Sequence, residues 1–330
     1  MENINKKFHR IFDKFVMDSF EFESGAILEN VVVEYVTRGN PIYDDEGNIL
    51  NAIIYCPTLK GGCSIFDLHG EPVNYLELFN DFFFIKIISL GAPDSCSPSS
   101  TELRYNFPVY TVKDRVNFKK QFLKEKFDMD KVLGIIGEGI GGSEVYTWAC
   151  EYPDDMEFIV NLNSSFKTFG YGHVFARCVE AMLESSEDIR SEVHSTSLSM
   201  MSVSIYRLLF AGYFPKMILE NLSADEIDFK MDDYVDEALF LDVHDINFRN
   251  KCILNYDVED KLSNIKAKSL ILGIKGGILF NPISDEIISI TDKIDDCTVK
   301  IFDSTKEDYE TGNFTKLFDE LASFLKQFKK

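Results

Sequence analysis

The sequence predicts an α/β fold with a mostly parallel sheet that helices cover on both faces. Three observations support this. Short apolar runs rich in Ile and Val recur along the chain, as strands buried on both faces do. Helical patterns alternate with several of them. Residues 170–256 break the alternation, with helical stretches and no clear strand. The expected strands are Asn30–Val36, Ala52–Cys56, Phe82–Leu90, Val132–Gly137, Phe158–Leu162, Ser269–Ile274 and Thr298–Phe302.

Helix starts are marked by capping-box spacing, in which a Ser or Thr precedes an acidic residue by three positions. Thr111 and Asp114 open the helical pattern Thr111–Phe127, and Ser223 and Glu226 open another. The last fifteen or so residues place apolar side chains at helical spacing and are expected to form a closing helix. We therefore expect a core of residues 1–169 and 257–330, with a helical cap inserted at 170–256.

Composition and charge exclude several classes of partner. The chain has 330 residues and a net charge of −21, from 34 Lys and Arg against 55 Asp and Glu. This balance argues against binding to nucleic acid or to an anionic membrane surface. No apolar run reaches the length of a bilayer span, and charges occupy the N-terminal region where a signal peptide would be apolar. Seven cysteines without paired spacing indicate reduced thiols, so we expect a cytoplasmic protein.

The sharpest local feature is a strand, a glycine-rich turn and a helix between residues 132 and 149, which read VLGIIGEGIGGSEVYTWA. Gly137, Gly139 and Gly142 satisfy the spacing of a dinucleotide-binding fingerprint, and Glu157 follows about twenty residues after the turn. The fingerprint belongs at the first strand of its unit, however, and here several strands precede it. The second interpretation is a nucleophile elbow, a strained turn that lifts one side chain above the sheet. In that interpretation the central residue is Gly139.

Six ordered segments resemble the homoserine O-acetyltransferase family of the α/β-hydrolase superfamily. The resemblance covers nearly the whole chain, and the region 170–256 matches least. It implies an α/β-hydrolase fold, acyl transfer from an acyl-CoA to a hydroxyl acceptor, and a homodimer. The matching segments are FEFESGAILENVVVEYVTRGN from Phe20, IIYCPTLKGG from Ile53, SLGAPDSCSPSS with FPVYTVKDRV, EGIGGSEVYTWACEYPD, KSLILGIKGGILFNP and IFDSTKEDY.

The resemblance implies a Ser–His–Asp triad, and this sequence lacks it. The nucleophile position falls on Gly139, the Asp position on Gly277, and the His position on Asp308, or on Glu307 if the loop slips by one. The loss of the base does not depend on the alignment, because the last of the five histidines is His244.

The resemblance implies that the oxyanion hole persists in this sequence, whereas the residue that recognises the acceptor is changed. The backbone positions of the oxyanion hole fall on Leu59 and Ile140. The cap arginine that binds the acceptor carboxylate in the family falls on Val179, with Arg177 two residues away.

Other residues could supply chemistry near the turn. Ser143 lies one helical turn after Gly139 and could serve as a relocated nucleophile, although a packing role is the simpler interpretation of a serine at this position. Glu138 could pair with Glu307 or Asp308 as two carboxylates across a pocket. No spacing typical of metal ligands is found, so we expect no metal and no cofactor, with acetyl-CoA as co-substrate only in an active enzyme.

Three hypotheses follow. The first is an inactive homologue that binds a small molecule or a protein partner, with Glu138, Ser143 and Arg177 as candidate pocket residues. The second is an active acyltransferase or hydrolase with a relocated nucleophile. The third is a dinucleotide-binding oxidoreductase.

Overall fold

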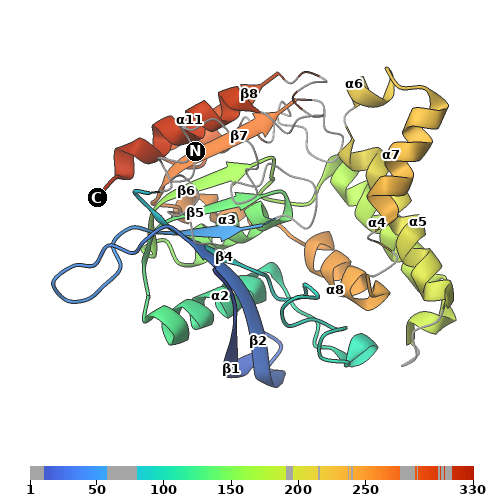
Figure 1. Cartoon of the computed structure of the whole chain (residues 1–330), viewed down its shortest axis with the longest axis horizontal. Coiled ribbons are helices and arrows are strands. Elements are labelled where there is room, and N and C mark those ends of the chain that lie inside the picture. Colours follow the sequence, from blue (N-terminus) through green and yellow to red (C-terminus); the bar gives the residue numbers. More distant parts are fainter. Residues whose placement is uncertain are drawn as a thin grey trace, which may run out of the picture.

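A computed structural model describes residues 11–57, 80–190, 196–214, 216–236, 238, 241–275, 287, 289–303, 305, 308 and 314–330. Its centre is an eight-stranded sheet in the order β1-β2-β4-β3-β5-β6-β7-β8 (Figure 1). β1 and β2 form an antiparallel hairpin, β2 pairs antiparallel with β4, and the remaining pairs are parallel. The strands are β1 (Ile11–Glu21), β2 (Ile27–Arg38), β3 (Ala52–Cys56), β4 (Phe83–Ile87), β5 (Val132–Glu138), β6 (Met156–Leu162), β7 (Lys268–Ile274) and β8 (Cys297–Phe302).

Helices cover both faces of the sheet. On one face, α2 (Val112–Phe127) and α3 (Ile140–Glu151) pack against side chains such as Ile135 and Ile159. On the other face, α11 (Thr315–Leu325) packs against the alternate positions of the same strands, such as Ile136. This alternation buries nearly every central strand position and explains the continuously apolar runs. The fold class predicted from the sequence is confirmed.

The helices between β6 and β7, here named the cap helices, have an apolar core of their own. In Figure 1, α4, α5 and α7 stand together beside the sheet, and α8 lies between them and the rest of the molecule. The cap helices are α4 (Gly170–Glu184), α5 (Thr196–Tyr213), α6 (Lys216–Leu219), α7 (Ala224–Asp236) and α8 (Val243–Leu254). Short 3₁₀ helices are η1 (Arg104–Asn106), η2 (Glu187–Arg190), η4 (Glu259–Asn264), η5 (Ser289–Asp292) and η6 (Lys326–Phe328).

Both predicted capping boxes are found. The Thr111 hydroxyl accepts from the N–H of Asp114, whose carboxylate accepts from the N–H of Thr111 at 2.8 Å. Ser223 and Glu226 make the same reciprocal pair before α7. Within the described ranges, no helix is long and apolar enough to span a membrane.

Candidate functional site at the glycine elbow

The elbow joins β5 to α3 at the centre of the sheet. Gly139 stands between them with φ 52° and ψ −119°, a backbone conformation that side-chain-bearing residues rarely adopt. The sequence-based interpretation of a strained strand-to-helix turn therefore matches the geometry at this residue. The apex of the turn carries only a hydrogen atom.

The neighbouring glycines are required by close packing within the protein. A Cβ on Gly141 would stand 2.1 Å from the carbonyl oxygen of Cys56, and one on Gly142 would stand 2.3 Å from the Ser164 side chain. A Cβ on Gly137 would meet Val145 at 2.5 Å. These glycines face other protein atoms, so their spacing is explained by the elbow without a bound pyrophosphate.

Ser143 lies in the first turn of α3, and its hydroxyl donates to the Ile140 carbonyl at 2.6 Å. That carbonyl is its one hydrogen-bond partner within the described part of the chain. The side chain is buried, with 5% exposure. Cys56 ends β3 beside the elbow, and burial raises the pKa of its thiol to about 12, so it stays protonated and unreactive at neutral pH.

The two carboxylate candidates lie in different settings. Glu138, the last residue of β5, is buried and accepts a hydrogen bond from the Tyr55 hydroxyl at 3.0 Å. Asp308 accepts hydrogen bonds from Thr305, at 2.6 Å from its backbone N–H and 2.8 Å from its hydroxyl. Three other expected site positions, Leu59, Gly277 and Glu307, lie outside the described residues.

A cavity of about 90 Å³ opens beside the elbow, between Ile140 and the cap helices. Val179, the position to which the resemblance assigns the family's arginine, lines it with an apolar side chain. Arg177 is instead half exposed and pairs with Glu180 at 2.7 Å. The described lining residues are Ile140, Val179, Ile205, Tyr206, Leu209, Tyr234, Ile246, Arg249, Asn250 and Ile253.

Two polar residues that the sequence pattern did not indicate reach this cavity from α8. Arg249 and Asn250 lie between Ile246 and Ile253 at spacings of three and four residues, so all four share one helix face. A charged residue on the buried face of an amphipathic helix was the available signal. Recognising it required knowing which face of α8 is buried.

Beneath the elbow, Glu144 of α3 is fully buried between two cations of α2. Arg115 Nη2 lies 2.7 Å from one carboxylate oxygen, and Lys119 Nζ lies 2.7 Å from the other. The Ser89 hydroxyl donates to Glu144 at 2.8 Å. Burial alone would raise the pKa of Glu144, but Arg115 and Lys119 outweigh it and the pKa lies below its usual value. This cluster ties the elbow helix to α2.

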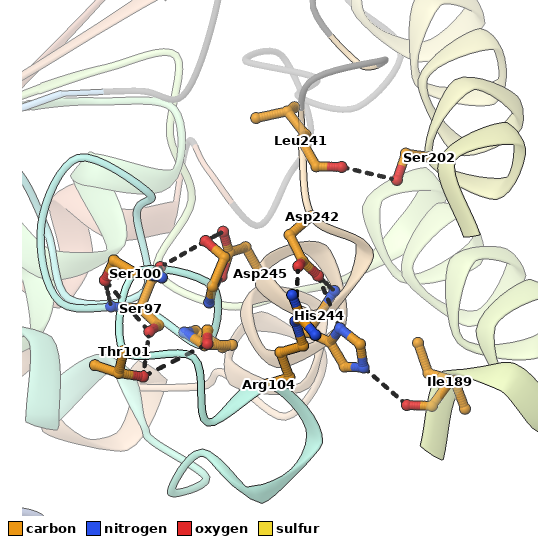
Figure 2. A network of polar contacts seen from close by, with 12 residues as sticks. Ser97, Ser100, Thr101, Arg104, Ile189, Ser202, Leu241, Asp242, His244 and Asp245 are labelled. Carbon is orange, nitrogen blue, oxygen red and sulfur yellow. Dashed lines mark hydrogen bonds and ion pairs between the residues drawn. The ribbon is translucent and has the colours of Figure 1, made fainter. Parts of the chain in front are cut away.

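A second polar network joins the start of α8 to the core and to η2, the short 3₁₀ helix that follows α4 (Figure 2). The ring of His244 lies 2.7 Å from Asp242 through Nδ1 and 2.8 Å from the Ile189 carbonyl through Nε2. Arg104 approaches Asp242 at 3.6 Å. Asp245 accepts a hydrogen bond from the Ser99 N–H at 2.9 Å. Residues 223–245 hold nine acidic side chains, of which Asp245 is buried and Asp242 is partly buried.

Comparison with known proteins agrees with the fold and identifies the family. No protein-family model matches the chain. A protein of Methanothermobacter thermautotrophicus described as a probable acyltransferase is 34% identical over 315 residues, covering 94% of this chain and 96% of that protein. The homoserine O-acetyltransferase of Haemophilus influenzae is 28% identical over 297 residues, covering 78% and 82%. The chain belongs to the homoserine O-acetyltransferase family.

Solved structures of α/β hydrolases share this fold over almost the entire chain. The homoserine O-acetyltransferase of Staphylococcus aureus superposes with a TM-score of 0.74 at 16% identity, covering 96% of this chain and 95% of that one. An acetylester hydrolase of Corynebacterium glutamicum gives 0.77 at 16% identity, covering 97% and 96%. At 16% identity these structures establish the fold alone.

Proposed function

We propose that this member of the homoserine O-acetyltransferase family is catalytically inactive and binds a small molecule in the cavity beside the elbow, as a binding or regulatory protein. The observation that carries the proposal is Gly139 at the apex of the turn, where the resemblance assigns the nucleophile. The elbow keeps its geometry and its close-packed glycines but presents no hydroxyl or thiol.

The expected loss of rate is large. Removing the nucleophile or base of a triad lowers turnover on the order of 10⁶-fold. The remaining hydrogen-bond donors and binding contacts support about 10³–10⁴-fold over water. His244, the last histidine in the sequence, is buried and held between Asp242 and the Ile189 carbonyl. Both ring nitrogens of His244 therefore contact other protein atoms, which argues against a role for this histidine as the catalytic base.

The names of the relatives favour a second candidate, an acyltransferase with a relocated nucleophile. Ser143 is the nearest hydroxyl in the sequence to the apex. In that case acetyl-CoA would be the donor and a homoserine-type hydroxyl the acceptor. Against it stands the hydrogen bond of Ser143 to the Ile140 carbonyl, which directs the hydroxyl into its own helix turn.

The experiment is an acetyl-transfer assay with acetyl-CoA and homoserine, with the Haemophilus influenzae enzyme as a positive control. We expect no O-acetylhomoserine above background and no acetyl adduct on the protein by intact-mass spectrometry. Turnover or an adduct that the variant Ser143→Ala abolishes would establish the second candidate instead. On the resemblance, we further propose a cytoplasmic homodimer, which analytical ultracentrifugation would test for assembly.

A further inference from the structure

Arg249 is a buried cation that lacks a counter-ion among the described residues. Its exposure is 9%, yet no hydrogen bond or ion pair to its guanidinium is found within the described ranges. Asp245, one turn earlier on α8, holds its carboxylate against Ser99 rather than against this side chain. A buried guanidinium without a partner costs free energy, because it loses hydration and gains no compensating contact.

The setting of Arg249 is a cavity that is otherwise mostly apolar. Aliphatic side chains from the elbow, α4, α5 and α8 form most of the lining, to which Asn250 also contributes. The Asn250 amide nitrogen donates to the Ala176 carbonyl at 2.9 Å, which fixes the residue against α4. Arg249 and Asn250 therefore mark one polar corner of the cavity.

The charge of the lining decides between classes of ligand. The described lining residues include one cation, Arg249, and no Asp or Glu. A carboxylate would neutralise that cation with two parallel hydrogen bonds. An ammonium group, by contrast, would meet no described carboxylate in the lining. The volume of about 90 Å³ lies below that of a cavity that takes benzene, so about six non-hydrogen atoms, the number in benzene, is the upper limit for a ligand.

We propose that the cavity beside the elbow binds a short aliphatic monocarboxylate, with its carboxylate on Arg249 and its alkyl chain against the aliphatic lining. The site selects against the zwitterionic form of an amino acid of the same length. This inference rests on the proposed function, because it names the ligand class of the same cavity.

The test uses three ligands of nearly equal shape: butyrate, butyramide and 2-aminobutyrate. Dissociation constants are measured by calorimetry and by ligand-observed NMR on the full chain. Butyrate is expected to bind at least roughly tenfold more tightly than butyramide, since a hydrogen-bonded charge pair replaces a neutral contact. A similar margin is expected over 2-aminobutyrate, because its ammonium would lose hydration without meeting a described carboxylate in the lining. Equal affinity for butyrate and butyramide, or no binding of butyrate, would overturn the proposal.

Variants locate the site. Arg249→Gln is expected to remove the preference for butyrate, and Arg249→Lys to retain part of it. Arg177→Gln, which alters the half-exposed arginine of α4, is the matched control and should leave affinity unchanged. Arg249→Met addresses folding: its melting temperature without ligand should not fall below that of the wild type, while butyrate should no longer raise it. Unchanged butyrate affinity in Arg249→Gln would place the anion elsewhere and sink the inference.

The acetyl-transfer assay separates the two proposals. Butyrate binding through Arg249 together with acetyl transfer would keep this inference and overturn inactivity. If no acetyl transfer is found and butyramide binds as tightly as butyrate, the proposed inactivity is kept and the inference about Arg249 is overturned.

Discussion

Gly139 combines a positive φ with a position that the family resemblance assigns to a nucleophile. In an active hydrolase the nucleophile itself adopts this strained backbone conformation, because catalysis needs its side chain at the apex of the turn. Here glycine adopts it at little cost. The backbone geometry of the elbow therefore persists without the side chain that gave it a chemical use, because the packing of Gly141 and Gly142 against neighbouring backbone and side chains fixes the turn independently.

Placing a serine at the apex should cost stability without creating activity. Gly139→Ser is expected to lower the free energy of unfolding by about 1–2 kcal/mol, since a side chain at positive φ is strained. Acetyl transfer should stay at background, because the position assigned to the histidine base holds Asp308 or Glu307 and the position assigned to its orienting aspartate holds Gly277. Urea unfolding and the acetyl-transfer assay measure the two effects.

Gly170→Ser is the matched control for strain. Gly170 has φ 54°, and a Cβ there would meet nothing within 4 Å. A similar loss of stability in both variants would attribute the cost at Gly139 to the backbone alone. Turnover in Gly139→Ser that approaches that of an active relative would show that another group already serves as base, contrary to the proposed inactivity.

At the scale of elements, burial decides how well the sequence predicts structure. β3 was predicted to the residue because all five of its positions are buried and apolar. The first half of the β1–β2 hairpin was missed, since Ile11–Glu21 lies at the edge of the sheet and mixes charged with apolar side chains. The elbow was predicted because glycine spacing is local. The polar corner of the cavity was not, since it forms only when α8 packs against α4 and the elbow.

The contact between α2 and α3 depends on one buried carboxylate. Glu144→Gln is expected to lower the free energy of unfolding by about 3–5 kcal/mol, because Arg115 and Lys119 would remain buried without a counter-charge. Urea unfolding followed by circular dichroism measures the loss. As a control, Glu220→Gln removes the exposed partner of Lys216 and should change stability by less than about 0.5 kcal/mol. Equal effects of the two substitutions would contradict the buried-cluster interpretation.

Across the whole molecule, the net charge of −21 conceals two different populations of carboxylates. Most are exposed and screened, and contribute little individually. A few are internal and set the pH dependence of stability. Glu144 has a lowered pKa because of its two cations, whereas burial raises the pKa of Asp245 against the hydrogen bonds of Ser99. These two groups act in opposite directions as the solution is acidified.

Acidification should selectively remove the contribution of Glu144. A carboxyl group with a lowered pKa in the folded state stabilises the fold above its ordinary value of 4.5, and this stability is lost as the pH falls through the folded-state pKa. Asp245 and the exposed carboxylates titrate equally in wild type and in Glu144→Gln, so their effects cancel between the two proteins. The difference in free energy of unfolding between wild type and variant should therefore be constant from neutral pH down to 4.5 and shrink below it. Urea unfolding of both proteins at several pH values down to about pH 3.5 measures this difference. A difference that stays constant over the whole range would mean that Glu144 is not the group whose protonation weakens the fold.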